Sequence, residues 1–232
     1  MRAIRHITPR YIINRLAVMA YQWSNPTVPW LTRSANAILL SWLKPTDRGL
    51  EWGSGRSTVW LAGNVAHLTT IEEDPCWGES VKTSLCSAGL SQRVDLILAT
   101  IADHDTAAGS SPYVRAADLI PPGSLDFCIV DGAVRDHCAI LALSRLREGG
   151  LLIIDNVERY LPRVLPSSSP NARSLDDGPA SNVWRLFMMS VAEWRCIWTT
   201  DGISDTAIWV KPFDSQPNET RTRRMEASEA EK

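Results

Sequence analysis

Acidic side chains occupy the ends of four predicted β-strands, and they are the residues best able to do chemistry in this sequence. The set is Glu51, Glu72 (followed by Glu73 and Asp74), Asp131, and Asp155 (followed by Asn156). In an open parallel sheet, the carboxyl ends of the strands face the crevice in which ligands bind. Several carboxylates at one place repel each other unless cations or hydroxyl donors lie among them. The pattern therefore predicts a site for a cation or for hydroxyl groups.

Two of these positions have a purely structural interpretation as well. Asp74 precedes Pro75, and an acid in that place is typical of a helix N-cap. We expect Asp74 to cap a helix. Asp155 and Asn156 together are also compatible with a cap-and-turn pair that ends a strand.

A glycine turn follows the first of these acids, in the segment Glu51-Trp52-Gly53-Ser54-Gly55-Arg56-Ser57-Thr58. Two glycines let the backbone approach a ligand closely, and the helix that begins near Ser57 offers free N–H groups. A nicotinamide cofactor is disfavoured because Ser57 or Thr58 stands where the dinucleotide fingerprint has its third glycine. A P-loop is excluded because no Gly-Lys-Ser/Thr follows. A hydrolase is disfavoured because the turn lacks the Gly-x-Ser-x-Gly elbow.

The elements that position these residues alternate between strand and helix. Apolar runs of strand length and helical stretches follow each other, and the runs are apolar on both faces, which is typical of a parallel sheet covered on both sides. We predict strands at Gly49–Trp52, His67–Ile71, Val94–Leu98, Phe127–Val130 and Leu151–Ile154, and helices at Ser57–Asn64, Trp77–Ala88 and Val134–Leu146, the last closed by Glu148-Gly149-Gly150. In the polar stretch 104–123 a further helix is short or missing.

The remaining segments flank this alternation. An amphipathic helix is expected after Pro9, with Ile12, Leu16, Met19 and Trp23 at helical spacing, and a second helix at Ser34–Leu43. Leu161–Ser181 is a long loop that we interpret as a lid or as disorder. A helix at Asn182–Ala192 precedes an antiparallel hairpin formed by Trp194–Thr199 and Thr206–Val210. We divide the chain into a basic helical extension (1–46), a central α/β domain (47–213) and a flexible tail (214–232).

Composition and charge narrow the class of protein. The chain has 232 residues and five cysteines at irregular spacing, which exclude a disulfide scaffold and favour a reducing compartment, so we expect a cytoplasmic protein. No apolar run approaches the roughly 20 residues of a membrane span, and no secretory signal is visible. Residues 1–44 carry six basic and no acidic side chains, whereas the remainder holds 18 basic and 26 acidic ones. This balance disfavours a nucleic-acid partner.

The order of these motifs resembles the class I S-adenosylmethionine-dependent methyltransferases. The resemblance rests on Glu-x-Gly-x-Gly at 51–55, on an acid after the second strand (Thr69-Thr70-Ile71-Glu72) and on the terminal hairpin, and it covers roughly residues 48–160. It implies a doubly wound, mostly parallel seven-stranded sheet with N-terminal helices and a C-terminal antiparallel hairpin. The tetrapeptide Asp/Asn-Pro-Pro-Tyr/Phe/Trp of methyltransferases that act on amino groups of DNA or glutamine is absent.

The resemblance also implies how this chain would hold S-adenosylmethionine. Gly53 and Gly55 would lie under its methionine part, with Glu51 near the amino group and Ser57 at the carboxylate. Glu72 would accept both ribose hydroxyls, and Ile101, Ala102 and Asp103 would flank the adenine. Trp52 or Trp77 could stack on that ring. The implied cofactor residues are Glu51, Gly53, Ser54, Gly55, Ser57, Glu72, Ile101, Ala102 and Asp131.

A narrower resemblance concerns the cation-dependent small-molecule O-methyltransferases of the catechol type. It rests on Leu125–Asp131 and on Gly149–Asn156, and it implies one divalent cation, Mg²⁺, bound by Asp131, Asp155 and Asn156. Such a cation would lower the pKa of the acceptor hydroxyl and align it with the methyl group. The chain departs from that group at Val134, where a lysine base is common. Asp131 and His137 are the remaining candidates for the catalytic base, because Arg135 does not readily deprotonate.

Three functions follow from these patterns. The first is methyl transfer from S-adenosylmethionine to an oxygen nucleophile of a small molecule. The second keeps the cofactor and drops the metal, with an unknown acceptor. The third is a non-catalytic binding module on the same fold.

The basic leader has three interpretations of its own. Its first helix could cover the substrate pocket, dock on a membrane surface through its arginines and its apolar face, or belong to an organelle transit peptide. A homodimer is a further expectation for the whole chain.

Overall fold

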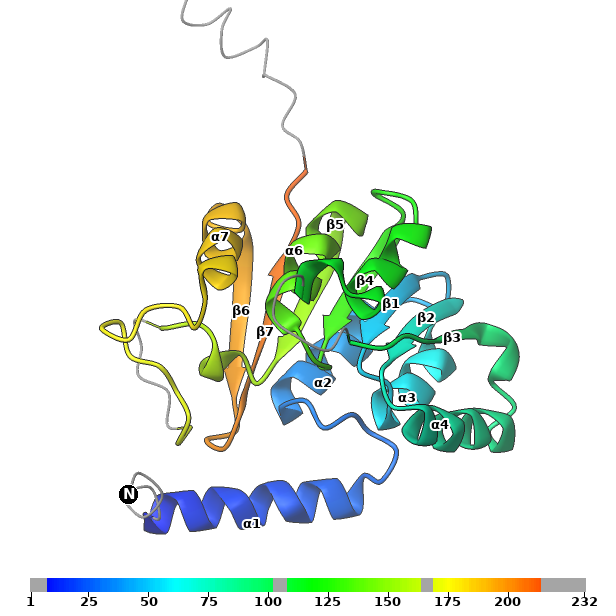
Figure 1. The fold of residues 1–232 in the computed structure, drawn as a ribbon. Coiled ribbons are helices and arrows are strands. Elements are labelled where there is room, and N and C mark those ends of the chain that lie inside the picture. The colour runs from blue at the N-terminus through cyan, green and yellow to red at the C-terminus, as the bar shows by residue number, and fades with distance from the viewer. Residues whose placement is uncertain (1–7, 102–107, 164–168, 214–232) are drawn as a thin grey trace, which may run out of the picture.

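The computed structural model describes residues 8–101, 108–163 and 169–213, and one seven-stranded sheet runs through it (Figure 1). The strands are β1 (Arg48–Trp52), β2 (His67–Glu72), β3 (Val94–Leu98), β4 (Leu125–Val130), β5 (Leu146–Asp155), β6 (Arg195–Thr200) and β7 (Asp205–Val210). They lie in the order β3-β2-β1-β4-β5-β7-β6. The first five pair in parallel, and the β6–β7 hairpin joins β5 antiparallel. The predicted fold class is confirmed.

The register of the sheet brings the acidic strand ends to one level. Trp52, the last residue of β1, pairs with both Ile71 of β2 and Val130 of β4. Val130 pairs in turn with Ile154 of β5. The residues that follow these partners are Glu72, Asp131 and Asp155, so the three carboxylates leave the sheet side by side along its carboxyl edge.

Helices cover both faces of the sheet (Figure 1). One layer consists of α2 (Arg33–Trp42), α3 (Arg56–Asn64) and α4 (Pro75–Ser87), and the other of α5 (Pro112–Arg115), α6 (Arg135–Arg145) and α7 (Asn182–Ser190). Alternate residues of each strand pack against the two helix layers. In β4, Cys128 and Val130 pack toward α6, whereas Phe127 and Ile129 pack toward α2 and α3. All four are fully buried, which is why this strand is a continuous apolar run.

The boundary between α6 and β5 differs from the prediction. The helix ends at Arg145, and β5 begins at Leu146, so that Glu148-Gly149-Gly150 lies inside the strand and not at the end of the helix. Gly149 N–H donates to the Lys211 carbonyl and Lys211 N–H donates to the Gly150 carbonyl. Gly149 has φ +74°, a conformation that favours glycine. The two glycines therefore bend an irregular strand start and do not stop a helix.

The short segment before β4 contains little regular helix. Helix α5 has four residues, with 3₁₀ turns at Ala108–Ser110 and Ala116–Leu119 on either side. Tyr113 and Val114 of α5 are nevertheless buried against the sheet. The expectation of a short helix in this region is correct.

The two N-terminal helices differ in how they meet the body. Helix α2 is part of the core, because Ala35 and Leu39 are fully buried and its N-cap residue Thr32 bonds to Thr199 and Thr206 of the hairpin. Helix α1 (Pro9–Ser24) has no buried residue and lies apart from the sheet in Figure 1. The structure thus ties residues of the predicted extension 1–46 to the sheet through α2, while the domain boundaries remain a prediction.

None of the helices in the described residues is long and apolar enough to cross a membrane.

Candidate functional site

Two glycines let the β1 and β4 turns pack against each other at the carboxyl edge of the sheet. Gly53 has φ +91°, and a Cβ there would come within 2.6 Å of the Gly132 backbone. A Cβ on Gly132 would lie 1.9 Å from the Tyr113 hydroxyl oxygen. Neither position accepts a side chain without moving backbone. This close packing fixes the glycine turn directly beside Asp131.

Glu51 is buried beneath the glycine turn with half of its carboxylate unpaired. Thr58 and Thr70 hydroxyls donate to Oε2 at 2.5 and 3.0 Å, and Oε1 has no hydrogen-bond partner. Burial raises the pKa of this carboxyl to about 7, although the nearby Ser57 hydroxyl and the hydrogen bonds from Thr58 and Thr70 counteract the rise. A buried acceptor without a donor is costly, so this atom calls for a ligand group that donates a hydrogen bond or carries positive charge.

Glu72, at the end of β2, already has four donors. Ser54 N–H and the Ser54 hydroxyl donate to Oε2 at 2.9 and 2.7 Å, and the backbone N–H groups of Glu73 and Asp74 donate to Oε1, both at 2.9 Å. A carboxylate offers about four acceptor positions. A ligand hydroxyl at Glu72 therefore has to replace the Ser54 hydroxyl, which can rotate away. As expected, Asp74 is the N-cap of α4 and accepts from Cys76 and Trp77 N–H groups.

A pocket of about 310 Å³ opens beside these residues. Its walls are Trp30, Gly53, Ser54, Gly55, Arg56, Ser57, Trp77 and Asp131. Trp77 is held over the glycine turn by a bond of 2.7 Å from its indole N–H to the Ser54 carbonyl. Trp52 does not reach the pocket, because it is fully buried and donates to the Tyr113 carbonyl. Of the two tryptophans considered for stacking on a ligand ring, only Trp77 borders the space.

Trp30 and Arg56 line the pocket although sequence reasoning did not select them. The Arg56 guanidinium lies 5.0 Å from the centre of the Trp30 ring, and its buried Nη1 has no hydrogen-bond partner. Trp30 is held in place by its neighbours, since Asn36 donates to the Pro29 carbonyl at 2.9 Å and Thr32 binds the hairpin. Arg56 directly follows the glycine motif, so the sequence did contain a signal that this residue borders the pocket. Trp30 lies 21 residues before Glu51 in sequence, and no motif points to it.

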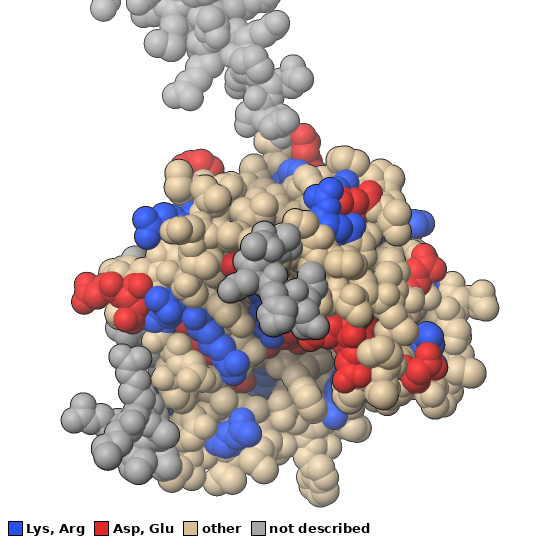
Figure 2. Space-filling view, viewed as in Figure 1, with Lys and Arg blue, Asp and Glu red and all other residues tan. Residues whose placement is uncertain are grey.

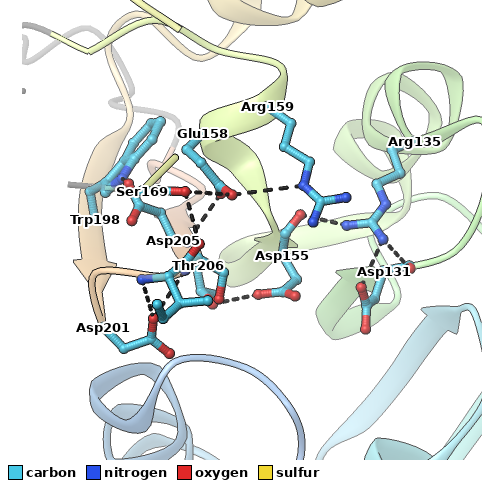
Figure 3. A network of polar contacts seen from close by, with 12 residues as sticks. Asp131, Arg135, Asp155, Glu158, Arg159, Ser169, Trp198, Asp201, Asp205 and Thr206 are labelled. Atoms are coloured by element: carbon cyan, nitrogen blue, oxygen red, sulfur yellow. Dashed lines mark hydrogen bonds and ion pairs between the residues drawn. The ribbon is translucent and has the colours of Figure 1, made fainter. Parts of the chain in front are cut away.

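The ends of β4 and β5 are bridged by Arg135 (Figure 3). Arg135 Nη2 lies 2.9 Å from Asp131 Oδ1, and Arg135 Nη1 donates to the Asp155 carbonyl at 2.6 Å. Asp131 keeps about a third of its side chain exposed, at 32%, and lines the pocket. Burial raises the pKa of Asp131 above its ordinary value, and the charge and hydrogen bonds of Arg135 oppose that rise.

Asp155 points into the protein and not into the pocket. Thr206 Oγ1 donates to its Oδ1 at 2.6 Å, and the residue is 4% exposed. Burial, and then the negative charge of Asp131, raise the pKa of Asp155 well above its ordinary value. Asn156 has φ +48° in the left-handed region, which asparagine tolerates well, and it turns the chain away from the sheet.

These surroundings do not fit the divalent cation that the catechol-type resemblance implies at Asp131, Asp155 and Asn156. A guanidinium already pairs with Asp131, and a hydroxyl donor already binds Asp155. A divalent ion at this place would be repelled by the fixed positive charge of Arg135. Elsewhere within residues 8–101, 108–163 and 169–213 there is no cluster of three or more His, Cys, Asp and Glu side chains suited to a metal.

The other candidates are spread more widely. His137 does not line the pocket; its ring packs toward Gly109, and its Nδ1 lies 3.9 Å from Asp136 Oδ1. Ile101 is half-buried and packs against the core next to β3. Ala102 and Asp103 lie outside the described residues. The structure therefore brings Gly53, Ser54, Gly55, Ser57 and Asp131 to one pocket, with Glu51 and Glu72 directly behind it.

Comparison with known proteins gives one partial sequence match. A catechol O-methyltransferase of Mycobacterium tuberculosis (strain H37Rv) is 27% identical over 119 residues, which make up 48% of this chain and 49% of that enzyme. The match thus spans about half the length of this curated relative. No protein-family model matches the chain.

Solved structures share the fold over most of the chain. TomG, an O-methyltransferase of Streptomyces achromogenes solved with S-adenosylmethionine, has a TM-score of 0.52 and 24% identity, covering 89% of this chain and 91% of its own. An rRNA methylase of Streptococcus thermophilus has a TM-score of 0.52 and 11% identity, covering 78% and 95%. Likeness at these identities establishes the Rossmann-like methyltransferase fold. It does not choose between small-molecule and RNA acceptors, since both neighbours have it.

Proposed function

We propose that this chain, which has the fold of the class I S-adenosylmethionine-dependent methyltransferases, transfers a methyl group from that cofactor to an oxygen atom of a small molecule. The observation that carries the proposal is the unpaired Glu51 Oε1, buried under a glycine turn beside a 310 Å³ pocket. The amino group of the cofactor is the cation that such an atom lacks. The pocket is of the size at which small-molecule sites begin.

The other parts of the cofactor have partners in the same place. Its carboxylate would lie at Ser57 and the N-terminus of α3, where free N–H groups and the helix dipole favour an anion. Its ribose would bind Glu72 in exchange for the Ser54 hydroxyl. Of the residues expected at the adenine, Ile101 would flank it, and Trp77 borders the same space. When bound, the cofactor supplies a methyl group already activated on a sulfonium, so the protein has to supply alignment and removal of a proton.

Asp131 is the residue that we assign to the acceptor. Among the described residues that line the pocket it is the one carboxylate, and about a third of its side chain is exposed. An acceptor hydroxyl at Asp131 would lie beside the glycine turn, and transfer requires its oxygen to stand opposite the sulfur, in line with the methyl–sulfur bond. His137 remains a weaker proposal for the base, because it is not among the residues on this wall.

The acceptor class rests on two observations. The name of the partial relative from Mycobacterium tuberculosis states a small aromatic acceptor. Figure 2 shows a row of basic side chains on one side of the hollow near the middle and acidic side chains on its other side, so the face drawn there is not basic throughout, as a nucleic-acid-binding face typically is. Both support a small molecule. The five cysteines are free, which supports a cytoplasmic location.

Helix α1 supports a second, peripheral proposal. Its exposed apolar residues Ile12, Ile13, Leu16, Met19 and Trp23 accompany Arg10 and Arg15, and no acid lies among them. A basic amphipathic helix of this kind binds in the plane of an anionic membrane surface. We propose that contact for α1, and treat a homodimer through the same face as the alternative outcome.

Calorimetric titration of S-adenosylhomocysteine tests the main proposal. The wild-type protein should bind it, and Glu51→Gln should weaken binding by tenfold or more because the partner of the amino group loses its charge. Glu79→Gln, an exposed substitution on α4, is the matched control and should bind as the wild type does. A wild-type protein that takes up no S-adenosylhomocysteine would leave the fold as a binding module without this cofactor.

A further inference from the structure

Arg135 makes contacts that are unusual for a residue in its position. Nε donates to the Gly132 carbonyl at 2.8 Å, Nη1 to the Asp155 carbonyl at 2.6 Å, and Nη2 to the Asp131 carbonyl at 2.5 Å as well as to the Asp131 carboxylate. Four of its five N–H donors are thus engaged. The side chain is 13% exposed, and its guanidinium stands over the Tyr160 ring at 5.8 Å.

The position of the Arg135 guanidinium is energetically unfavourable, and contacts within the site have to compensate for it. Arg135 is the first residue of α6, where the helix dipole favours anions and disfavours a positive charge. Val134, just before it, has φ +46°, a strained conformation for a β-branched residue. Strain of this kind persists where surrounding structure requires it. Here the requirement is a guanidinium directed back to the ends of β4 and β5, as Figure 3 shows.

We infer that the Arg135 guanidinium takes the place of a divalent cation between the ends of β4 and β5, so that the site works without a metal and accepts single hydroxyl groups. The charge argument supports the first part. The Asp131 carboxylate pairs with the Arg135 guanidinium, which also binds the Asp155 backbone carbonyl, so a side chain of the protein already supplies the positive charge beside the two acids. The half-exposed Arg159 guanidinium lies beside Arg135 in Figure 3 and adds to that charge.

The second part follows from the donors that remain. A metal with open positions can bind two adjacent oxygens of one acceptor, which selects vicinal diols. Arg135 has at most one N–H left for an acceptor. One hydroxyl can therefore bind at Asp131 and Arg135, and a second hydroxyl beside it gains no partner from this group. The acceptor class that fits is a phenol or alcohol with one reacting hydroxyl.

The transfer step balances between the acceptor hydroxyl, the methyl–sulfur bond of the cofactor and the Asp131 carboxylate. As the acceptor oxygen forms its bond to the methyl carbon, the hydroxyl proton passes to the Asp131 carboxylate. The methyl–sulfur bond breaks, and its electron pair stays on the sulfur. Asp131 then releases the proton to solvent through its exposed third. This acceptor step rests on the proposed function, whereas the replacement of the metal by Arg135 does not.

Binding of Mn²⁺, followed by its electron paramagnetic resonance signal, tests the replacement. Wild type and the charge-conserving Arg135→Lys should show no site that saturates at one ion per chain. Arg135→Gln should gain such a site, because the Asp131 carboxylate then lacks its paired cation, and the double variant with Asp131→Asn should lose it again. Arg145→Gln, which breaks the ion pair between another partly buried arginine of α6 and Asp118, is the matched control and should gain none.

Two results overturn the inference. One is a Mn²⁺ site in the wild type that Asp131→Asn removes. The other is a folded Arg135→Gln variant, checked by circular dichroism, that binds no more Mn²⁺ than the wild type. Failure of S-adenosylhomocysteine binding would overturn the proposed function and leave the Mn²⁺ result intact. Nuclear magnetic resonance with phenol and catechol probes tests the acceptor class, with S-adenosylhomocysteine present and with either EDTA or Mg²⁺ added: equal binding of both probes in EDTA supports it, and catechol binding that requires Mg²⁺ contradicts it.

Discussion

At the scale of single residues, each carboxylate along the sheet edge is stabilised by a different partner. Threonine hydroxyls bind Glu51, backbone N–H groups and a serine bind Glu72, and a guanidinium binds Asp131. These partners leave each carboxylate with a different capacity to accept hydrogen bonds from a ligand. Glu51 retains an unpaired oxygen, Glu72 can take a ligand hydroxyl only in place of the Ser54 hydroxyl, and Asp131 is partly open to the pocket. One row of similar acids can therefore serve three different parts of a ligand.

Glu51 should make the stability of the protein depend on pH. Its raised pKa, about 7 against 4.5 in the unfolded chain, means that the folded protein binds the proton more tightly. The stabilisation is complete below pH 4.5 and is lost as the pH rises to about 7, a change of about 3 kcal/mol. Urea unfolding of wild type and Glu51→Gln at several pH values should show their difference shrinking by about this amount toward high pH.

The exposed Glu193→Gln variant provides the comparison for that measurement. Its free energy of unfolding should stay parallel to that of the wild type at every pH. A Glu51→Gln variant that also stays parallel to the wild type would mean that folding does not raise the pKa of Glu51.

At this scale, the positions of the acids at the strand ends could be predicted, because an apolar run followed by an acid shows where a strand leaves the sheet. Glu51, Glu72, Asp131 and Asp155 all lie there. Their partners could not be predicted. Whether Arg135 points back toward Asp131 depends on the left-handed turn at Val134, and a single sequence gives no sign that valine adopts it. The expectation of a metal followed from the acids without that knowledge.

At the scale of elements, the strands and the N-terminal helices could all be located closely, and the largest difference is the early start of β5 at Leu146. The strands are short apolar runs with polar ends, and burial on both faces leaves few other arrangements. For α1 and α2 the helical spacing was correct, but spacing does not reveal what a helix packs against. Helix α2 lies in the core, and α1 exposes the apolar side chains that its pattern would assign to a buried face.

Removing the two helices one after the other should separate these roles. A chain that begins after Ser24 should keep its melting temperature within experimental error, because α1 contributes no buried residue. A chain that also lacks α2 should melt far lower or fail to fold, since Leu39 and Ala35 leave the core and Thr32 leaves the hairpin. Differential scanning calorimetry measures both. A large loss in the first truncation would show that α1 packs on the body in solution.

At the scale of the whole molecule, charge is distributed unevenly along the chain. The first 44 residues carry six positive charges and no negative ones, while the remainder has a net charge of −8. Near an anionic surface the body is repelled and the leader attracted, so the molecule should turn α1 toward the lipid. That orientation brings the exposed apolar residues of α1 to the membrane, whereas dimerisation through α1 would cover the same residues with protein.

Sedimentation with lipid vesicles decides between these two arrangements. The protein should sediment with phosphatidylglycerol vesicles and not with phosphatidylcholine vesicles, and raising the salt concentration should weaken binding because the attraction is partly ionic. Trp23, 88% exposed, should contribute a blue shift in fluorescence that Trp23→Phe reduces. The chain that begins after Ser24 should stay in solution. If the full chain ignores both vesicle types and light scattering gives twice the mass of the truncated chain, the apolar face of α1 pairs with a second copy and the membrane contact is wrong.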